Sequence, residues 1–152
     1  MQAGVSILVA THDANLRPNQ TRAFGCLIDP ATDTLDILIS APQATALLAD
    51  IRANGAIAAV FCRPSSSQAL QIKAIGADTT DATAKHMQAA RQYRDNMIAE
   101  IQPLGFRAEM LGAVFTVEAN DLTVIRCRPH VVFEQTPGPN AGNALASSET
   151  TP

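Results

Sequence analysis

Charged side chains are scarce in this 152-residue chain and form no strong patch. They make up 16% of the residues, and the formal net charge is −3. The basic residues are scattered, and only Arg126 and Arg128 come close to forming a cluster. Proteins that hold nucleic acid neutralise its phosphates with grouped Lys and Arg, so this distribution argues against a nucleic-acid partner.

Long apolar runs and targeting signals are also missing. No apolar stretch approaches the roughly 20 residues that a membrane-spanning helix needs. Residues 1–10 lack the basic region that opens a secretory signal peptide. We therefore expect a cytoplasmic protein with no membrane partner. A hydrophobic content of 47% over this length is enough for one domain with a sizeable core.

The common catalytic and metal-binding motifs are absent. The sequence contains no G-x-G-x-x-G, no Walker loop and no H-E-x-x-H. The three histidines, His12, His86 and His130, lack the spacing of metal ligands. The serine run 65–67 has no identifiable base beside it. We predict no metal site, and the sequence assigns no catalytic residue.

Cysteine is rare, and its distribution bears on the cellular compartment. Cys26, Cys62 and Cys127 each fall in an apolar run, and none belongs to a C-x-x-C pair. We interpret them as buried free thiols that act as small hydrophobic side chains, which favours a reducing cytoplasm. A redox or metal role is the alternative.

What the chain does contain is a dense series of strands. Within residues 34–40, apolar side chains alternate with polar ones such as Asp36 and Ser40, the period-2 pattern of a half-buried strand. The full set of predicted strands is 4–11, 20–28, 34–40, 56–62, 68–77, 111–118 and 122–127. The register of the second strand would place Arg22, Phe24, Cys26 and Ile28 on one face.

Two helices are predicted between the strands. Residues 43–54 form an amphipathic helix, closed by Gly55 where a left-handed C-cap is expected. Residues 82–102 form a longer helix that ends at Pro103. About seven hairpin-connected strands with two helices predict a mostly β or α+β fold, best fitted by a small antiparallel barrel.

The composition changes near the C-terminus, which suggests three segments. We expect the barrel domain over residues 1–128 and a C-terminal extension over 129–142, with a short edge segment at 129–133. Residues 143–152 are small and polar and predict a disordered tail.

The order of these pieces resembles the pyridoxamine 5'-phosphate oxidase-like, FMN-binding split-barrel family. The resemblance covers roughly residues 5–127. It rests on the segments VATHDANLRPNQTRAFGCLID, LDILIS, LLADIRANGAIAAVFCRP and SSSQALQIKAIG. The family typically has a strand opening with Arg, a strand ending in hydroxyl residues, and a strand with Gln and a final Gly. The resemblance implies an antiparallel split β-barrel and an FMN-dependent oxidoreductase activity, with substrate and electron donor unidentified.

In that family, FMN lies between the two subunits of a homodimer. By resemblance, Arg22 would reach the FMN phosphate, Ala23 and Phe24 would lie along the ring, and Ser40 would donate a hydroxyl hydrogen bond. The other residues that the resemblance assigns to the cofactor pocket are Thr45, Arg63, Ser65, Ser67, Gln68 and Gln71. A low charge content and the small residues 56–59 also favour a homodimer.

One departure from the family pattern keeps other readings open. Residues 41–46 contain no Lys or Arg, although the family usually places a phosphate-binding cation there. A charge-assisted contact is roughly twice as strong as a neutral one, so FMN binding should weaken unless Gln43, Thr45 and the helix N-terminus compensate. The alternatives are a non-catalytic split-barrel dimer that binds a different ligand or none, and a barrel that binds haem or a deazaflavin.

The individual site residues also have plain structural readings. Arg22 is equally well explained as a surface or salt-bridging residue at a strand start, Arg63 as a solvated strand end, and Phe24 as a core residue.

Overall fold

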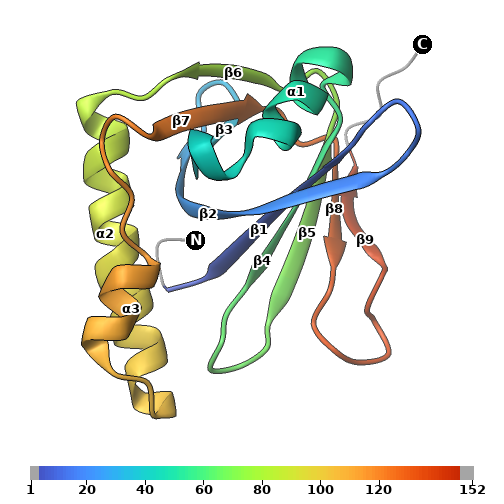
Figure 1. Ribbon diagram of the computed structural model, residues 1–152. Helices are drawn as coiled ribbons and strands as arrows, with labels where there is room; N and C mark the ends of the chain where they lie inside the picture. The colour runs from blue at the N-terminus through green and yellow to red at the C-terminus, as the bar shows by residue number, and fades with distance from the viewer. Residues whose placement is uncertain (1–3, 148–152) are drawn as a thin grey trace.

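The computed structural model describes residues 4–147, and its main feature is one antiparallel sheet of nine strands (Figure 1). The strands are β1 (Ser6–His12), β2 (Pro18–Asp29), β3 (Thr34–Ser40), β4 (Ile57–Cys62), β5 (Ala69–Ala74), β6 (Asp78–Asp81), β7 (Leu122–Cys127), β8 (Val131–Glu134) and β9 (Ala144–Ser147). They are ordered β6-β7-β3-β2-β1-β4-β5-β8-β9 across the sheet. The predicted antiparallel, mostly β architecture is therefore confirmed, with nine strands rather than about seven.

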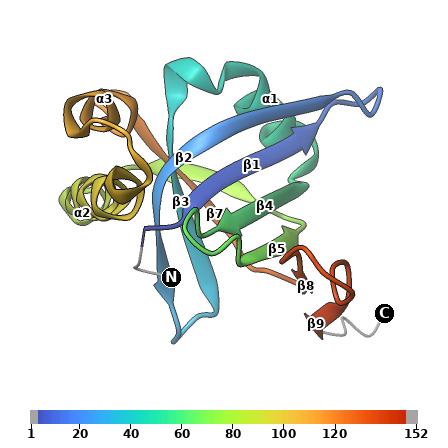
Figure 2. The same ribbon diagram turned by 90° about the horizontal axis from the view of Figure 1, so that it is seen from below.

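Strand β2 belongs to both halves of this sheet because it bends in the middle. Near its start, Arg22 pairs with Leu8 of β1, and near its end, Cys26 pairs with Ile37 of β3. Within the β2–β3 pairing the register shifts between Ala23, which pairs with Ile39, and Cys26, around Gly25, whose φ is +127°. Seen from below, the β2–β3 hairpin extends away from β1, β4 and β5 (Figure 2).

This bulge overturns the prediction that alternate residues from Arg22 to Ile28 share one face. An extra residue in a strand reverses the alternation beyond it. Ala23 and Cys26 both pack into the barrel core, whereas Phe24 belongs to a second cluster on the opposite face. The alternation of side chains in the sequence could not show the bulge, because Gly25 has no side chain to indicate which face it occupies.

The hydrophobic core consists of two clusters on the two faces of the sheet. The larger one fills the barrel with aliphatic side chains such as Ile7, Ile37 and Ile125, all fully buried. The smaller one lies between the outer face of β2, β3 and β7 and the helix α2 (Ala84–Ile101), and includes Phe24 and Ala90.

Helix α1 (Thr45–Asn54) covers one end of the barrel (Figure 1). It ends as predicted at Gly55, which is left-handed with a φ of +64° and donates its N–H to the carbonyl of Ile51. A Cβ at Gly55 would lie 3.1 Å from the backbone of Gly76, so both the conformation and the close approach require glycine.

The predicted strand over residues 111–118 is wrong. The helix α3 (Ala108–Val114) occupies its first part, after the 3-10 turn η2 (Gln102–Leu104) that follows α2. Leu111 and Phe115 are buried while Met110 and Val114 are exposed, and this spacing of four residues is helical. The apolar run was short enough for the strand and helix periods to be confused.

The C-terminal segments add a hairpin to the open edge of the sheet. Strand β8, within the predicted extension, pairs with β5, and β9 pairs with β8. Residues 144–147 thus form a strand where the sequence predicted a disordered tail, and residues 148–152 lie outside the described part of the chain. Within residues 4–147, no helix combines the length and apolarity needed to cross a membrane.

Candidate functional site

A row of side chains crosses the outer face of the sheet and leaves an apolar residue in contact with solvent. Directly opposed residues of antiparallel strands share a face. The pairs Arg22–Leu8, Leu8–Val60 and Val60–Gln71 therefore form one row, which we call the outer row. Leu8 is 46% exposed there, whereas its neighbour Ile7 points into the core.

Arg22 lies at one end of the outer row, next to Ser40. Because Ala23 pairs with Ile39, Arg22 and Ser40 occupy the next position along the two strands. Ser40 is buried, and Arg22 is exposed with its guanidinium carbon 5.2 Å from the centroid of the Phe115 ring, a cation–π contact. Among residues 4–147, no carboxylate forms an ion pair with Arg22.

The first turn of α1 is close to Ser40 in the chain and lacks a side-chain cap. The short 3-10 turn η1 (Ala41–Gln43) connects Ser40 to this helix, whose N-cap is Ala44. No acidic residue stands in the first turn, and Thr45 is exposed at its start. Free N–H groups at a helix N-terminus favour an anion. Arg22, Ser40 and this turn, together the Arg22 site, therefore have the donors that a phosphate requires.

Two of the predicted cofactor residues can contribute only their backbone. The side chains of Ala23 and Phe24 are 0% and 2% exposed and belong to the two core clusters. The plain reading of Phe24 as a core residue describes its side chain correctly.

The predicted residues of the β4–β5 loop form a separate group at the C-terminal end of α2. Arg63 Nε lies 3.3 Å from Glu100 Oε1, and the backbone N–H of Ser65 donates to the same oxygen over 3.1 Å. Hydrogen bonds from Ser65 and Arg63 lower the pKa of Glu100. Ser67 and Gln68 are exposed in the same loop. Arg63 is thus ion-paired with α2.

Gln71 is also distant from Arg22 within one protomer. Three strand spacings of about 4.8 Å separate the two ends of the outer row, roughly 14 Å in total. The ten residues that the resemblance implied therefore fall into the Arg22 site, the β4–β5 loop and the far end of the outer row. A single chain does not bring them together.

Phe115 and Glu100 are the residues that the sequence analysis missed. Phe115 packs edge-on against Tyr93, with ring centroids 6.2 Å apart, and holds the guanidinium of Arg22. It was missed because residues 111–118 were assigned to a strand. The i to i+4 spacing of Leu111 and Phe115 was the available signal.

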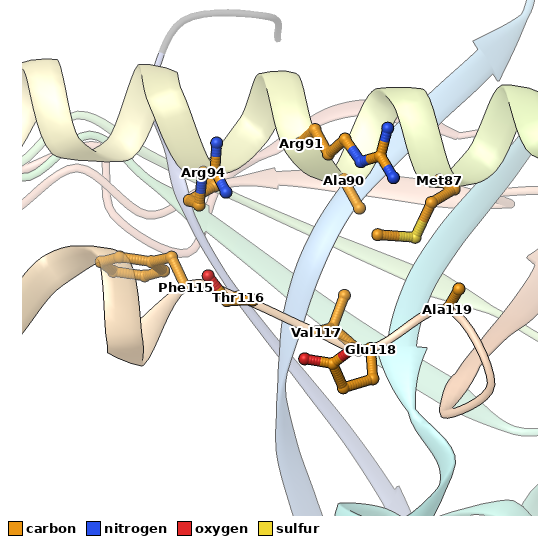
Figure 3. Close-up of a pocket in the computed structure, with 9 residues that line it drawn as sticks. All are labelled: Met87, Ala90, Arg91, Arg94, Phe115, Thr116, Val117, Glu118 and Ala119. Atoms are coloured by element: carbon orange, nitrogen blue, oxygen red, sulfur yellow. The ribbon is translucent and has the colours of Figure 1, made fainter.

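A pocket of about 210 Å³ lies beside Phe115, between α2 and residues 115–119 (Figure 3). Arg91 and Arg94 extend from the helix on one side, and Glu118 lies on the other. Arg94 is already bonded to Asp95, with Nη2 2.8 Å from Oδ1. Charges of both signs surround this pocket, so its charges do not favour an anion over a cation.

A second cavity on the outer face contains three nitrogen-bearing side chains. It measures about 340 Å³ and is lined by His12, Lys73 and His130 among others. Lys73 Nζ lies 5.2 Å from the centroid of the Phe133 ring, and His12 Nδ1 is 3.0 Å from the carbonyl oxygen of Asp13. Within the described residues, no group of three or more His, Cys, Asp or Glu side chains has the geometry to hold a metal ion.

Two of the three thiols are poorly suited to redox chemistry. Cys127 is buried, and Cys26 and Cys62 are half-buried. Burial raises the pKa of both Cys26 and Cys127 to about 11, which disfavours the reactive thiolate at neutral pH.

Comparisons with known proteins found similarity in structure only. No family model and no curated protein matches the sequence. An F420 reductase is 15% identical, with a TM-score of 0.57 over 86% of this chain and 90% of that one. A pyridoxamine 5'-phosphate oxidase-related, FMN-binding protein from Nostoc punctiforme is also 15% identical, with a TM-score of 0.50 over 89% and 76%. HutZ, the haem storage protein from Vibrio cholerae, is 18% identical, with a TM-score of 0.50 over 88% and 87%.

At these identities the likeness establishes a shared fold and no shared ligand. The three proteins are described by different cofactors, so the fold by itself does not choose among them. The resemblance in fold expected from the sequence is confirmed.

Proposed function

Because this chain has the split-barrel fold of the pyridoxamine 5'-phosphate oxidase-like proteins, we propose that it is an FMN-binding flavoprotein and an oxidoreductase. The cofactor binds at the interface of a homodimer. The observation that carries the proposal is the Arg22 site: an exposed guanidinium without an ion pair in residues 4–147, on the strand position next to Ser40, from which the turn η1 leads to the uncapped start of α1.

These groups suit the phosphate of FMN. A guanidinium forms charge-assisted hydrogen bonds to phosphate oxygens, and the helix N-terminus adds N–H donors and a favourable dipole. Ser40 and Thr45 supply hydroxyl groups. In this way Thr45 and the first turn of α1 compensate for the cation that residues 41–46 lack, while Arg22 supplies the positive charge. Bound FMN supplies the electron and hydride transfer chemistry, and the protein binds and orients it.

The outer row supports the dimer. Leu8 is 46% exposed on the outer face and is flanked by Val60 and the small residue Ala10, so a second copy of this face would remove apolar surface from water. It would also bring a second β4–β5 loop and Gln71 toward the Arg22 site, which one protomer does not do. The flavin ring then lies along the backbone of Ala23 and Phe24.

The experiment is an absorbance spectrum of the purified full chain before and after incubation with FMN and desalting. We expect flavin bands that stay with the protein, and a flavin affinity at least about tenfold lower in Arg22→Met because the charge-assisted contact is lost. The matched control is Arg52→Met, which removes an exposed arginine from the last turn of α1 and should leave the affinity unchanged. Equal affinities in the two variants would reject the assignment of Arg22.

A haem-binding barrel is the second candidate. It is supported by the cavity that both His12 and His130 line, because imidazoles bind haem iron. A Soret band after incubation with haemin, abolished in His12→Ala or His130→Ala and retained in Arg22→Met, would favour it over the flavin. A well-folded dimer that takes up neither FMN nor haemin would leave a non-catalytic dimer that binds a different ligand or none.

A further inference from the structure

The barrel has an open side between its two halves, and an apolar cavity of about 390 Å³ occupies it. One wall is the β2–β3 hairpin, and the other is formed by β4, β5 and β8. These two walls are not paired with each other in the sheet, because β1 and β4 lie between β2 and β5. We call this cavity the barrel mouth.

The barrel mouth has a buried floor and an exposed rim. Phe61 and Ile72 form the floor and are 5% and 8% exposed. Ile28 and Leu70 stand at the rim and are 48% and 37% exposed. A ligand that covers large aliphatic side chains exposed in a cavity removes apolar surface from water, which is favourable. Small-molecule sites typically have this size and this mainly apolar lining.

One cationic side chain, Arg128, lies at the rim and has N–H donors that are not used among the described residues. Arg128 Nη2 donates to the carbonyl oxygen of Thr32 over 2.9 Å, which ties the guanidinium to the β2–β3 turn. Within residues 4–147 no carboxylate is ion-paired with Arg128. A guanidinium carries five N–H donors, so several remain for a ligand.

The other charge at the rim sets a limit on the ligand. Asp33 also lines the barrel mouth, in the left-handed conformation with a φ of +53°, and makes no ion pair with Arg128. An anionic head is therefore attracted by Arg128 and repelled by Asp33. Neutralising Arg128 should therefore weaken the binding of an anionic ligand, whereas neutralising Asp33 should not.

We propose that the barrel mouth binds a small amphipathic carboxylate, with its alkyl or other apolar body between the two walls and its carboxylate on Arg128. The Arg22 site is on the outer face of the sheet, so this second site is separate from the proposed flavin site. The proposal does not depend on flavin binding.

The test is a titration of the full-length protein with decanoate, followed by methyl NMR below the micelle concentration. We expect saturable shifts of the methyl groups of Ile28, Leu70 and Ile72. Decanol and decylamine have the same chain without the negative charge, and should bind at least about tenfold more weakly than decanoate.

Neutralising each rim charge separates the head-group contact from the apolar one. Arg128→Gln should weaken decanoate at least about tenfold and leave decanol unchanged, whereas Asp33→Asn should leave decanoate binding equal or tighter. Arg17→Gln, at an exposed position in the β1–β2 turn, is the matched control and should change nothing. Leu70→Trp should block the cavity, with the remaining methyl spectrum showing that the barrel is folded.

Three results would overturn the proposal: no shifts at the barrel mouth, shifts that appear only with micelles, or equal decanoate affinity in Arg128→Gln and Arg17→Gln. FMN uptake measured on the same variants should not change. A failure here therefore leaves the flavin proposal intact, and a failure of flavin binding leaves this one intact.

Discussion

Arg126 holds the carboxylate of Asp36 with two parallel hydrogen bonds, Nε to Oδ1 at 2.7 Å and Nη2 to Oδ2 at 2.8 Å. His86 Nε2 lies 3.1 Å from the same Oδ2. Because Thr83 donates its backbone N–H to His86 Nδ1, the ring proton belongs on Nε2, where it can be donated to Asp36. One carboxylate on β3 thus ties together β7 and the first turn of α2.

Replacing Asp36 should destabilise the protein in a pH-dependent way. The hydrogen bonds from Arg126 hold the pKa of Asp36 below its ordinary value of 3.8, with His86 as a further cause. A lowered folded-state pKa contributes stability above the ordinary pKa, and this is lost as the pH falls through the folded pKa. We expect Asp36→Asn to cost about 1–3 kcal/mol at pH 7 and less at pH 3, measured by urea unfolding.

The control for that measurement is Asp95→Asn, which removes an exposed carboxylate bonded to Arg94. Such surface pairs contribute about 0–1 kcal/mol, so its effect should be small. If the two variants lost similar stability at pH 7, the role assigned to Asp36 would be wrong.

Two glycines should respond in opposite directions to alanine. At Gly25 the φ is +127°, and a Cβ would lie 3.1 Å from Tyr93 Cβ, so Gly25→Ala should cost about 1–3 kcal/mol. At Gly112, inside α3, a Cβ would meet nothing within 4 Å. Gly112→Ala should stabilise the protein by up to about 1 kcal/mol. Urea unfolding of both variants checks the pair, and a neutral Gly25→Ala would argue against the bulge described here.

The proposed dimer interface can be tested without any ligand. Leu8→Arg places a charge in the outer row, and burying an unpaired charge against an apolar partner is strongly unfavourable. We expect sedimentation velocity to show a dimer for the unmodified protein and a folded monomer for Leu8→Arg at the same micromolar concentration. Leu16→Arg, at a position 76% exposed in the β1–β2 turn, should remain dimeric. A dimer in both variants would exclude the outer row as the interface.

The sequence predicted most of the strands because their burial alternates along the chain. β3 shows this best: Leu35, Ile37 and Ile39 all pack into the barrel core, as their period-2 spacing indicates. The end of α1 was predicted for an equally local reason, since Gly55 marks a left-handed cap.

Two of the errors lie where the structure depends on partners outside the local pattern. Strand β9 is exposed along its whole length, its one large apolar residue Leu145 being 57% exposed, and it is a strand because β8 offers a free edge. The bulge at Gly25 requires the close approach of Tyr93 from α2, which no local pattern reveals.

The candidate site was the least predictable part for the same reason. Resemblance named Arg22 and Ser40, which the β2–β3 pairing makes neighbours. It also named Arg63, which the structure pairs with Glu100 on α2. A family resemblance names residues, but it does not show whether another side chain of the same protein already binds them.

The bend in β2 has a consequence for how the protein unfolds. Ala23 and Phe24 are consecutive, yet each belongs to a different hydrophobic cluster. Because one uninterrupted strand pairs with β1 through residues 18–22 and with β3 through Ala23 and residues 26–29, neither half can detach without opening the other's hydrogen-bonded edge. The two halves of the barrel should therefore unfold together as one cooperative unit rather than one after the other.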